Sequence, residues 1–348
     1  MEKFLKIVAT GGVIWLIIVL VLFPKECIDA GLSGVFLCLD TVIPSLFPFF
    51  VCSGIITGLG LARPLGKVFS PFMKPLFNVS GRGALPFVMG ILSGYPVGAK
   101  CVTDLYSSGE CSKSESEKLL AFCNNSGPMF ILGAVGAGMI GNVAIGRYLY
   151  IIHILSAFLT GIIMRFYKTK EEEVLSLPTC EKKDIISAIT EAVAKSTDSI
   201  VLVCGYVIFF CVAGKALSKL NITPLMHGLM EITGGTEKVI GLEMSLNEKL
   251  PIVSGVIAFS SLSVILQVLS IIRKTNLSPK LYLIGKTIQG VLAFCITKVF
   301  LMFVPISEMT ANITFSSLNT KSPWEISLGT AIIILILVVS LRRKKVDN

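Results

Sequence analysis

Three polar side chains, Asn124, Asn125 and Ser126, lie within an apolar run and are followed directly by Gly127 and Pro128. Proline lacks an N–H group and its ring clashes with the preceding helical turn, so we expect a helix to break here. A break at membrane depth frees backbone groups that lipid cannot satisfy, so it survives only against protein or a water-filled cavity. The amides and the hydroxyl could therefore bind a polar solute. The alternative is a proline kink whose amides only hold helices together.

A second stretch with this character spans residues 84–107. Each of its apolar halves has about 10 residues, too few to cross a hydrocarbon core of about 30 Å. The turn sequence SGYPVG (93–98) separates the halves. We predict a re-entrant helical hairpin whose tip contains Ser93, Gly94 and Tyr95. An ordinary transmembrane helix kinked at Pro96 is the alternative.

The composition indicates an integral membrane protein in direct contact with the lipid bilayer. Of the 348 residues 53% are hydrophobic and 15% are charged, and the mean hydropathy is +0.81. The net charge of +9 comes largely from short loops and the C-terminal tail, which indicates membrane topology rather than nucleic-acid binding. The sequence lacks a Ser/His/Asp set, a P-loop and an HExxH motif, so we expect no enzyme, no catalytic residues and no cofactor. Its cysteine spacing and two histidines do not suggest a metal site.

Two halves of the chain show the same order of apolar segments. The second half has an apolar segment (185–198), a spanning helix (199–217), a Gly-containing pair (225–242), a span interrupted by hydroxyls (250–272) and a plain span (281–304). In the first half we expect a retained helix (4–23), a short half-span (27–40), a spanning helix (41–61), a basic loop (63–82), the hairpin, the broken span and a plain span (146–166). SKSE (112–115) matches a capping box that opens the broken span. Shared order of elements is the mark of an internal repeat.

Basic residues then set the topology, with both termini in the cytoplasm. We predict an all-α polytopic membrane protein with two inverted repeats, about eight transmembrane helices and two re-entrant helical hairpins. The solute site would lie near the midplane where the repeats meet. The expected organisation is an N-terminal transmembrane helix (1–26), a first repeat (27–166), a charged cytoplasmic linker (167–184), a second repeat (185–304), and an outer loop with a last transmembrane helix and basic tail (305–348).

The second repeat would add polar groups to the same site. We expect contributions from its hairpin tip and its interrupted span, namely Thr233, Gly234, Gly235, Thr236, Ser260, Ser261 and Ser263. The alternative for the serines is a hydrogen bond to their own helix carbonyls. An intramembrane carboxylate such as Glu231 costs several kcal/mol unless it is solvated or paired, which suggests proton or sodium coupling, or a salt bridge. Lys100 would attract an anion, or its ammonium would extend to the interface.

The runs ILSGYPVGAK (91–100) and FCNNSGPMFILGAVG (122–136) resemble the sporulation integral membrane protein family typified by YlbJ, also called SpoVV. This family belongs to the nucleoside-recognition, or Gate, group. The run IAFSSLS (257–263) is similar to the hairpin motif of concentrative nucleoside transporters. The resemblance implies two Gate repeats and a role in endospore formation, moving dipicolinate across the membrane that surrounds the forespore. Where nucleoside transporters have a Gln-Thr-Glu type tip, this chain has SGYP and TGGT.

Three further hypotheses stay open. One is transport of a nucleoside or another metabolite. The second is a structural or assembly protein of the sporulation membrane, which would recruit partners through the charged linker (167–184). The third is a pore with no alternating access. The sequence also leaves open the direction of transport, the coupling ion and assembly into a homo-oligomer.

Overall fold

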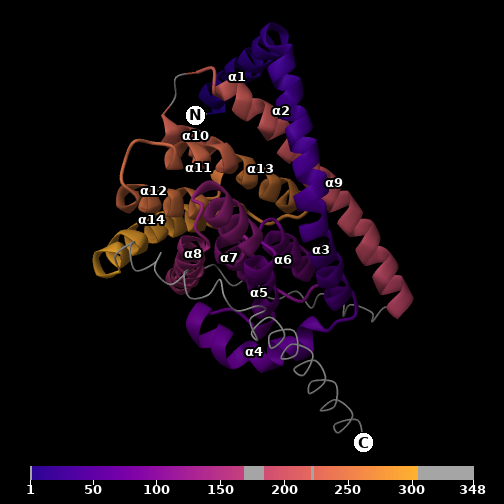
Figure 1. Cartoon of the computed structure of the whole chain (residues 1–348). Helices are drawn as coiled ribbons and strands as arrows, with labels where there is room; N and C mark the ends of the chain where they lie inside the picture. The colour runs from indigo at the N-terminus through magenta and orange to yellow at the C-terminus, as the bar shows by residue number, and fades with distance from the viewer. Residues whose placement is uncertain (1, 168–183, 221–222, 305–348) are drawn as a thin grey trace, which may run out of the picture.

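The computed structural model describes residues 2–167, 184–220 and 223–304, and every regular element within these ranges is helical (Figure 1). The elements are α1 (Glu2–Leu22), α2 (Pro24–Leu37), η1 (Cys38–Val42), α3 (Ile43–Gly58), α4 (Ala62–Phe77), η2 (Gly81–Gly83), α5 (Ala84–Leu92), α6 (Val97–Ser107), α7 (Lys113–Cys123), η3 (Met129–Met139), α8 (Val143–Met164), α9 (Ile185–Leu217), α10 (Pro224–Met230), α11 (Ile232–Ile240), α12 (Leu246–Phe259), α13 (Ser261–Ile272) and α14 (Lys280–Phe303). The all-α prediction is confirmed for this part of the chain.

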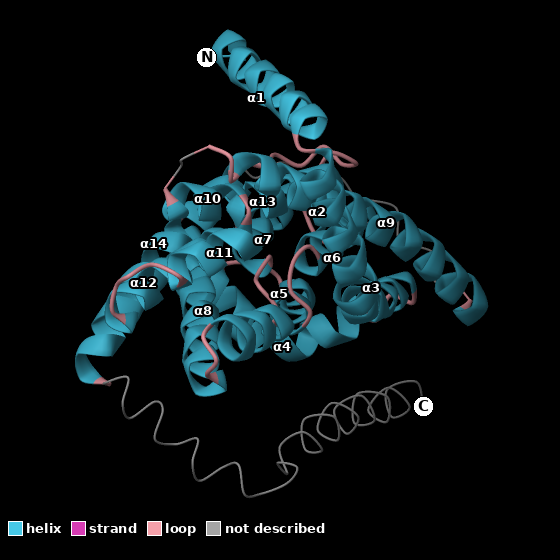
Figure 2. Ribbon diagram, turned by 45° about the horizontal axis from the view of Figure 1, so that its top comes forward, coloured by secondary structure: helices cyan, strands magenta, loops and turns pink. Residues whose placement is uncertain are grey.

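Four helical stretches among the described residues are long and apolar enough to cross a bilayer: α8, α9, the combined α12–α13 stretch and α14. A fifth is counted if α1 and α2, which meet at an angle of 107°, form one broken span. Figure 2 shows α1 standing away from the remaining helices. The expected total of eight crossings and the inverted repeats stay predictions, and the last expected helix falls outside the described residues.

Helix α9 is a single element of 33 residues, so the expected division of residues 185–217 into two segments is wrong. The N–H of Ser187 donates to the Asp184 carboxylate at 3.1 Å and caps the helix start. Hydrogen bonds from the Ser187 hydroxyl and N–H lower the pKa of this exposed carboxyl. Once started, α9 runs without a break beside α2 and α3 (Figure 1).

The expected half-span over residues 27–40 is also wrong, because α2, η1 and α3 form one continuous helical run. Glycines along this run allow close contact with α9. A Cβ at Gly34 would lie 2.9 Å from the Cα of Ile208, and one at Gly54 would lie 2.9 Å from the Cβ of Ala192. Small residues that let two membrane helices approach stabilise their packing, so the contact with α9 accounts for the helical state of the whole run.

The expected basic loop over residues 63–82 is largely the helix α4. Its Met73 and Phe77 side chains are buried in the core, whereas Lys67 and Lys74 are exposed. A helix with one apolar and one charged face packs on a core and leaves its charges in polar surroundings. The run of basic residues had masked this amphipathic pattern. Asn78, with a φ of 54°, ends the helix.

The first hairpin has the two short helices that the sequence predicted. Helices α5 and α6 meet at residues 93–96. The capping box is also confirmed, because Ser112 and Glu115 each accept a backbone N–H from the other at the start of α7. Beyond α7 the backbone is non-helical at residues 124–127, and helical structure resumes at Pro128. The proline break lies where local chemistry predicted it.

The second half is also broken twice. The span over residues 250–272 is interrupted at Ser260 and Ser261, which have φ values of 74° and 38°. The second hairpin, however, breaks at Glu231 and not within TGGT (233–236), which lies inside α11. The Glu231 carboxylate accepts the N–H groups of Thr233 at 2.9 Å and Gly234 at 2.6 Å. This side-chain cap starts the helix before the glycines and corrects the predicted tip.

The first hairpin tip packs directly against the broken span, as predicted. A Cβ at Gly90 or Gly98 would lie 1.7 or 1.9 Å from the Cys123 carbonyl oxygen. A Cβ at Gly94 would lie 2.6 Å from the backbone nitrogen of Gly127. Only glycine permits this backbone-to-backbone approach, so the tip and the break form one unit.

We therefore predict that Gly98→Ala lowers the free energy of unfolding by about 1–3 kcal/mol, because the added methyl group must push α6 away from α7. The measurement is the thermal unfolding midpoint of the purified protein in detergent. Gly205→Ala in α9 is the matched control, since a Cβ there meets nothing within 4 Å. Equal midpoints for both variants would contradict the close approach.

Candidate functional site

A cavity of about 750 Å³ lies between the two halves of the chain. Its walls come from α2, α3 and α9, from the first hairpin tip with the following break, and from α10, α11 and α13. Most of its lining is apolar, and the polar or charged residues on its wall are Ser33, Ser93, Tyr95, Lys215, Ser218, His227, Glu231, Thr233, Lys238, Ser263 and Gln267. A largely apolar pocket with a few polar groups is the usual form of a small-molecule site.

The sequence-predicted site residues divide into two groups around this cavity. Those on its wall are Ser93, Gly94, Tyr95, Glu231, Thr233, Gly234 and Ser263. Those that do not line it are Lys100, Asn124, Asn125, Ser126, Gly235, Thr236, Ser260 and Ser261. Both hairpin ends therefore reach the cavity, and the broken span reaches it through Gly127 and Met129. Asn124 and Asn125, which we expected to bind the solute, do not line this cavity.

Asn125 instead joins two helices through its buried side chain. Its Nδ2 donates to the Phe122 carbonyl at 2.9 Å, and its Oδ1 accepts from Gln289 Nε2 of α14 at 2.9 Å. Gln289 Oε1 in turn accepts from Lys286 Nζ at 2.7 Å. These bonds satisfy the amide within the protein, and this is the helix-joining alternative that the sequence had left open.

Asn124 is fully buried, and neither polar atom of its side chain has a hydrogen-bond partner in the described structure. The same holds for the hydroxyl of Tyr282, which faces Asn124 from α14. Buried polar groups are nearly always paired. Asn124 and Tyr282 therefore form a buried polar pair without hydrogen-bond partners. A water molecule, or a rearranged state of the break, would satisfy these groups.

Ser126 ties the break to both halves. Its N–H donates to His153 Nε2 of α8 at 3.0 Å, which fixes the imidazole as an acceptor at that nitrogen. Its hydroxyl lies 3.5 Å from the carbonyl oxygen of Ile257, near the end of α12. The break of the first half therefore lies against the helix that precedes the break of the second half.

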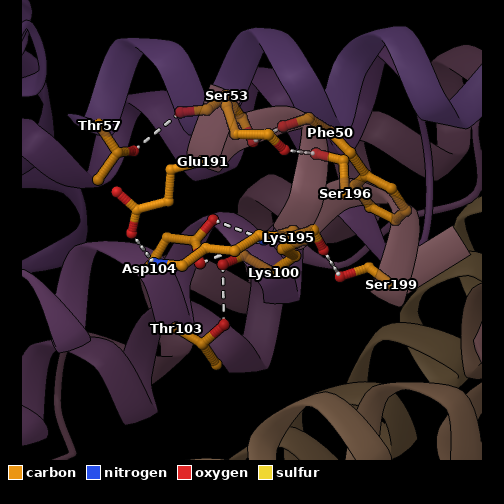
Figure 3. Close-up of polar contacts among 11 residues, drawn as sticks. Phe50, Ser53, Thr57, Lys100, Thr103, Asp104, Glu191, Lys195, Ser196 and Ser199 are labelled. Atoms are coloured by element: carbon orange, nitrogen blue, oxygen red, sulfur yellow. Dashed lines mark hydrogen bonds and ion pairs between the residues drawn. The ribbon is translucent and has the colours of Figure 1, made fainter. Parts of the chain in front are cut away.

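Lys100 lies away from the cavity, in a separate charged pocket of about 190 Å³ between α3, α6 and α9. Its ammonium contacts the Asp104 carboxylate at 2.9 Å. Figure 3 shows this pair beside Glu191 and Lys195 of α9, with Ser53 and Thr57 of α3 above. An ammonium held by a carboxylate on its own helix is an intrahelical ion pair, so the expected substrate contact of Lys100 finds no support.

Comparisons with known proteins agree with this geometry. Residues 39–146, which contain the first hairpin and the break, match the Gate family, described as nucleoside recognition. Over 311 residues the chain is 33% identical to the sporulation integral membrane protein YlbJ of Bacillus subtilis (strain 168), covering 78% of this chain and 76% of that protein. The chain belongs to the YlbJ family. No solved structure matches it.

One charged cluster of this YlbJ family member was missed by the sequence analysis. Lys215 lines the cavity and contacts Glu26 at 3.0 Å, and Lys219 contacts the same carboxylate at 2.8 Å. The Lys219 ammonium also lies 4.1 Å from the centre of the Phe23 ring. A signal was present in the sequence, because the expected topology puts both lysines on the outer side of the membrane, where the positive-inside rule disfavours them.

We predict that the Asn125–Gln289 contact contributes a coupling energy of about 1 kcal/mol, as a buried amide pair does. A double-mutant cycle with Asn125→Ala and Gln289→Leu, read from unfolding midpoints, measures it. The loss of the Lys286–Gln289 bond is common to both sides of the cycle and cancels. Strict additivity of the two substitutions would show that the contact contributes nothing to stability.

Proposed function

We propose that this protein is a transporter, without enzymatic activity, for a small polar or anionic solute. Dipicolinate during endospore formation is the leading substrate, and a membrane surrounding the forespore, with both termini cytoplasmic, is the proposed location. The observation that carries the proposal is the cavity bounded by both hairpins and both broken spans. Broken helices that meet around one cavity are the form of solute site that secondary transporters use.

The charge around the cavity favours an anion. Two lysines, Lys215 and Lys238, line it against one wall carboxylate, Glu231. Lys215 shares the Glu26 carboxylate with Lys219, so this group of three residues keeps one uncompensated positive charge beside the cavity. Helical segments also begin at its edge, after Tyr95, at Met129 and at Ile232. A helix start carries partial positive charge and exposed N–H groups, which attract carboxylates.

The shape of the cavity suits a flat aromatic dianion. Its wall is mostly apolar and includes the rings of Tyr95, Phe130 and Phe210. Dipicolinate combines a pyridine ring with two carboxylates, so it can use both the apolar wall and the cations. The relative from Bacillus subtilis is a sporulation integral membrane protein, which supports the same choice of substrate.

Glu231 is the proposed coupling residue, for protons or sodium. Its carboxylate holds the second hairpin together through the N–H groups of Thr233 and Gly234 and also lines the cavity. Protonation or cation binding would weaken or replace this cap. The state of the carboxylate would thereby change the hairpin that borders the solute.

A nucleoside is the second candidate, because the matched Gate family is described as nucleoside recognition. Tyr95 and Phe130 could stack on a base, and the hydroxyls of Ser93 and Ser263 could bind a ribose. The positive charge of Lys238 and of the Lys215–Lys219–Glu26 cluster would then meet no counter-charge on the substrate. The anion is favoured on that account.

We predict saturable uptake of labelled dipicolinate by proteoliposomes that contain the purified protein. Lys215→Met should raise KM about tenfold, because one cation–carboxylate contact is worth about 1.5 kcal/mol. Lys67→Met on the exposed face of α4 is the control and should leave KM unchanged. Saturable uptake of uridine with none of dipicolinate would select the nucleoside.

We also predict that Glu231→Gln removes the response of uptake to an imposed proton or sodium gradient. The variant can still accept N–H groups through its amide oxygen but carries no titratable charge. Uptake by Glu231→Gln without an imposed gradient is the control. If it equals wild-type uptake under the same conditions, the variant still binds the solute and has lost only the coupling. An unchanged gradient response would remove Glu231 from the coupling step.

An assembly role makes a different prediction. Deleting the acidic run Glu171, Glu172 and Glu173 from the linker should leave uptake unchanged if the protein is a transporter. Loss of sporulation function with normal membrane insertion and normal uptake would favour partner recruitment.

A homo-oligomer is a separate possibility. The mass of the purified protein in detergent measures its oligomeric state.

A further inference from the structure

Lys286 is a fully buried lysine that the proposed transport cycle does not use. Its side chain has no exposed surface, and its ammonium makes one hydrogen bond, to Gln289 Oε1. No carboxylate within the described residues pairs with it. Burying a lysine without a counter-charge costs free energy. Either its surroundings stabilise a cation, or the side chain is kept for a functional reason.

The surroundings of Lys286 are the end of the first broken helix. The preceding residue, Gly285, touches the last turn of α7, since a Cβ there would lie 2.4 Å from the Ala121 carbonyl oxygen. Gln289 links Lys286 to Asn125 in the break itself.

Helix ends supply the missing negative charge. The last carbonyl groups of a helix have no partner within it, and they carry the negative end of the helix dipole. The break at residues 124–127 exposes these carbonyls inside the protein instead of at a wet surface. A cation placed at such an end is stabilised, and more strongly where water is absent.

We propose that the Lys286 ammonium is a built-in cation for the first broken span. It lies beside the end of α7 and is linked to the break through Gln289 and Asn125. The break then needs no sodium ion from solution to be stable. Any sodium dependence of the transporter would arise elsewhere, at Glu231. The proposal concerns the break alone and holds whatever the solute is.

The competing explanation is that Lys286 only fills space. The two explanations predict opposite effects for Lys286→Met, which keeps the length of the side chain and removes the charge. Replacing a buried charge that has no role by an apolar group usually stabilises a protein. Removing a cation that neutralises a helix end destabilises it.

The test is the thermal unfolding midpoint of the full-length protein in detergent. We expect Lys286→Met to unfold several degrees below the wild type. Lys100→Met removes another buried lysine, one that has its own carboxylate, and is the matched reference for loss of an ion pair. A midpoint for Lys286→Met equal to or above that of the wild type would overturn the proposal.

Chemical rescue separates charge from volume. Lys286→Ala leaves a space that matches propylammonium, and the protein is purified with either propylammonium chloride or 1-propanol present. We expect propylammonium to raise the midpoint of Lys286→Ala, and 1-propanol and choline chloride to leave it unchanged. Equal rescue by 1-propanol, or no rescue by propylammonium, would overturn the proposal.

The third measurement uses the Glu231→Gln variant as background, which removes sodium binding at the hairpin. The unfolding midpoint of this variant should be the same in sodium, potassium and choline chloride at equal ionic strength. A sodium-specific rise in that background would show that the break binds an external cation, and would overturn the proposal. These readouts need no transported solute, so failure of dipicolinate uptake would leave them intact.

Discussion

The structure depends on one constraint, which is that backbone groups freed inside a membrane must be satisfied by the protein. Pro128 and Gly127 interrupt a helix at residues 124–127, where every side chain is buried. The Ser126 N–H donates to His153, and the Phe122 carbonyl accepts from Asn125, which Gln289 links to Lys286. The first hairpin tip packs against the same break. The second half solves the same problem at Ser260 and Glu231. The cavity exists because these four interruptions lie close together.

The local parts of this arrangement could be predicted from sequence. Proline, glycine and the capping box act within a few residues, so the first break, the first hairpin and the start of α7 lie where expected. The second hairpin tip was misplaced because two glycines look like a turn. The carboxylate of Glu231, three residues before the first of these glycines, caps the helix that contains them, so the chain stays helical there.

The partners of the site could not be predicted, because they are remote in the chain. Asn125 binds Gln289, 164 residues away, and Ser126 reaches Ile257, 131 residues away. The sequence around an asparagine does not show whether its amide has a hydrogen-bond partner on another helix. The same reason misled the assignment of Lys100, whose carboxylate one turn along the helix satisfies it. The cavity lysine Lys215 instead stood out only as an exception to the charge rule.

The central claim is that solute binds between the two hairpins, in the cavity that Tyr95 and Glu231 share. An electron cryomicroscopy structure of the protein with dipicolinate tests this claim most directly. The account predicts ligand density in that cavity, with a carboxylate near Lys215 or Lys238 and the ring beside Tyr95. Density in the Lys100 pocket between α3, α6 and α9, with the cavity empty, would contradict it.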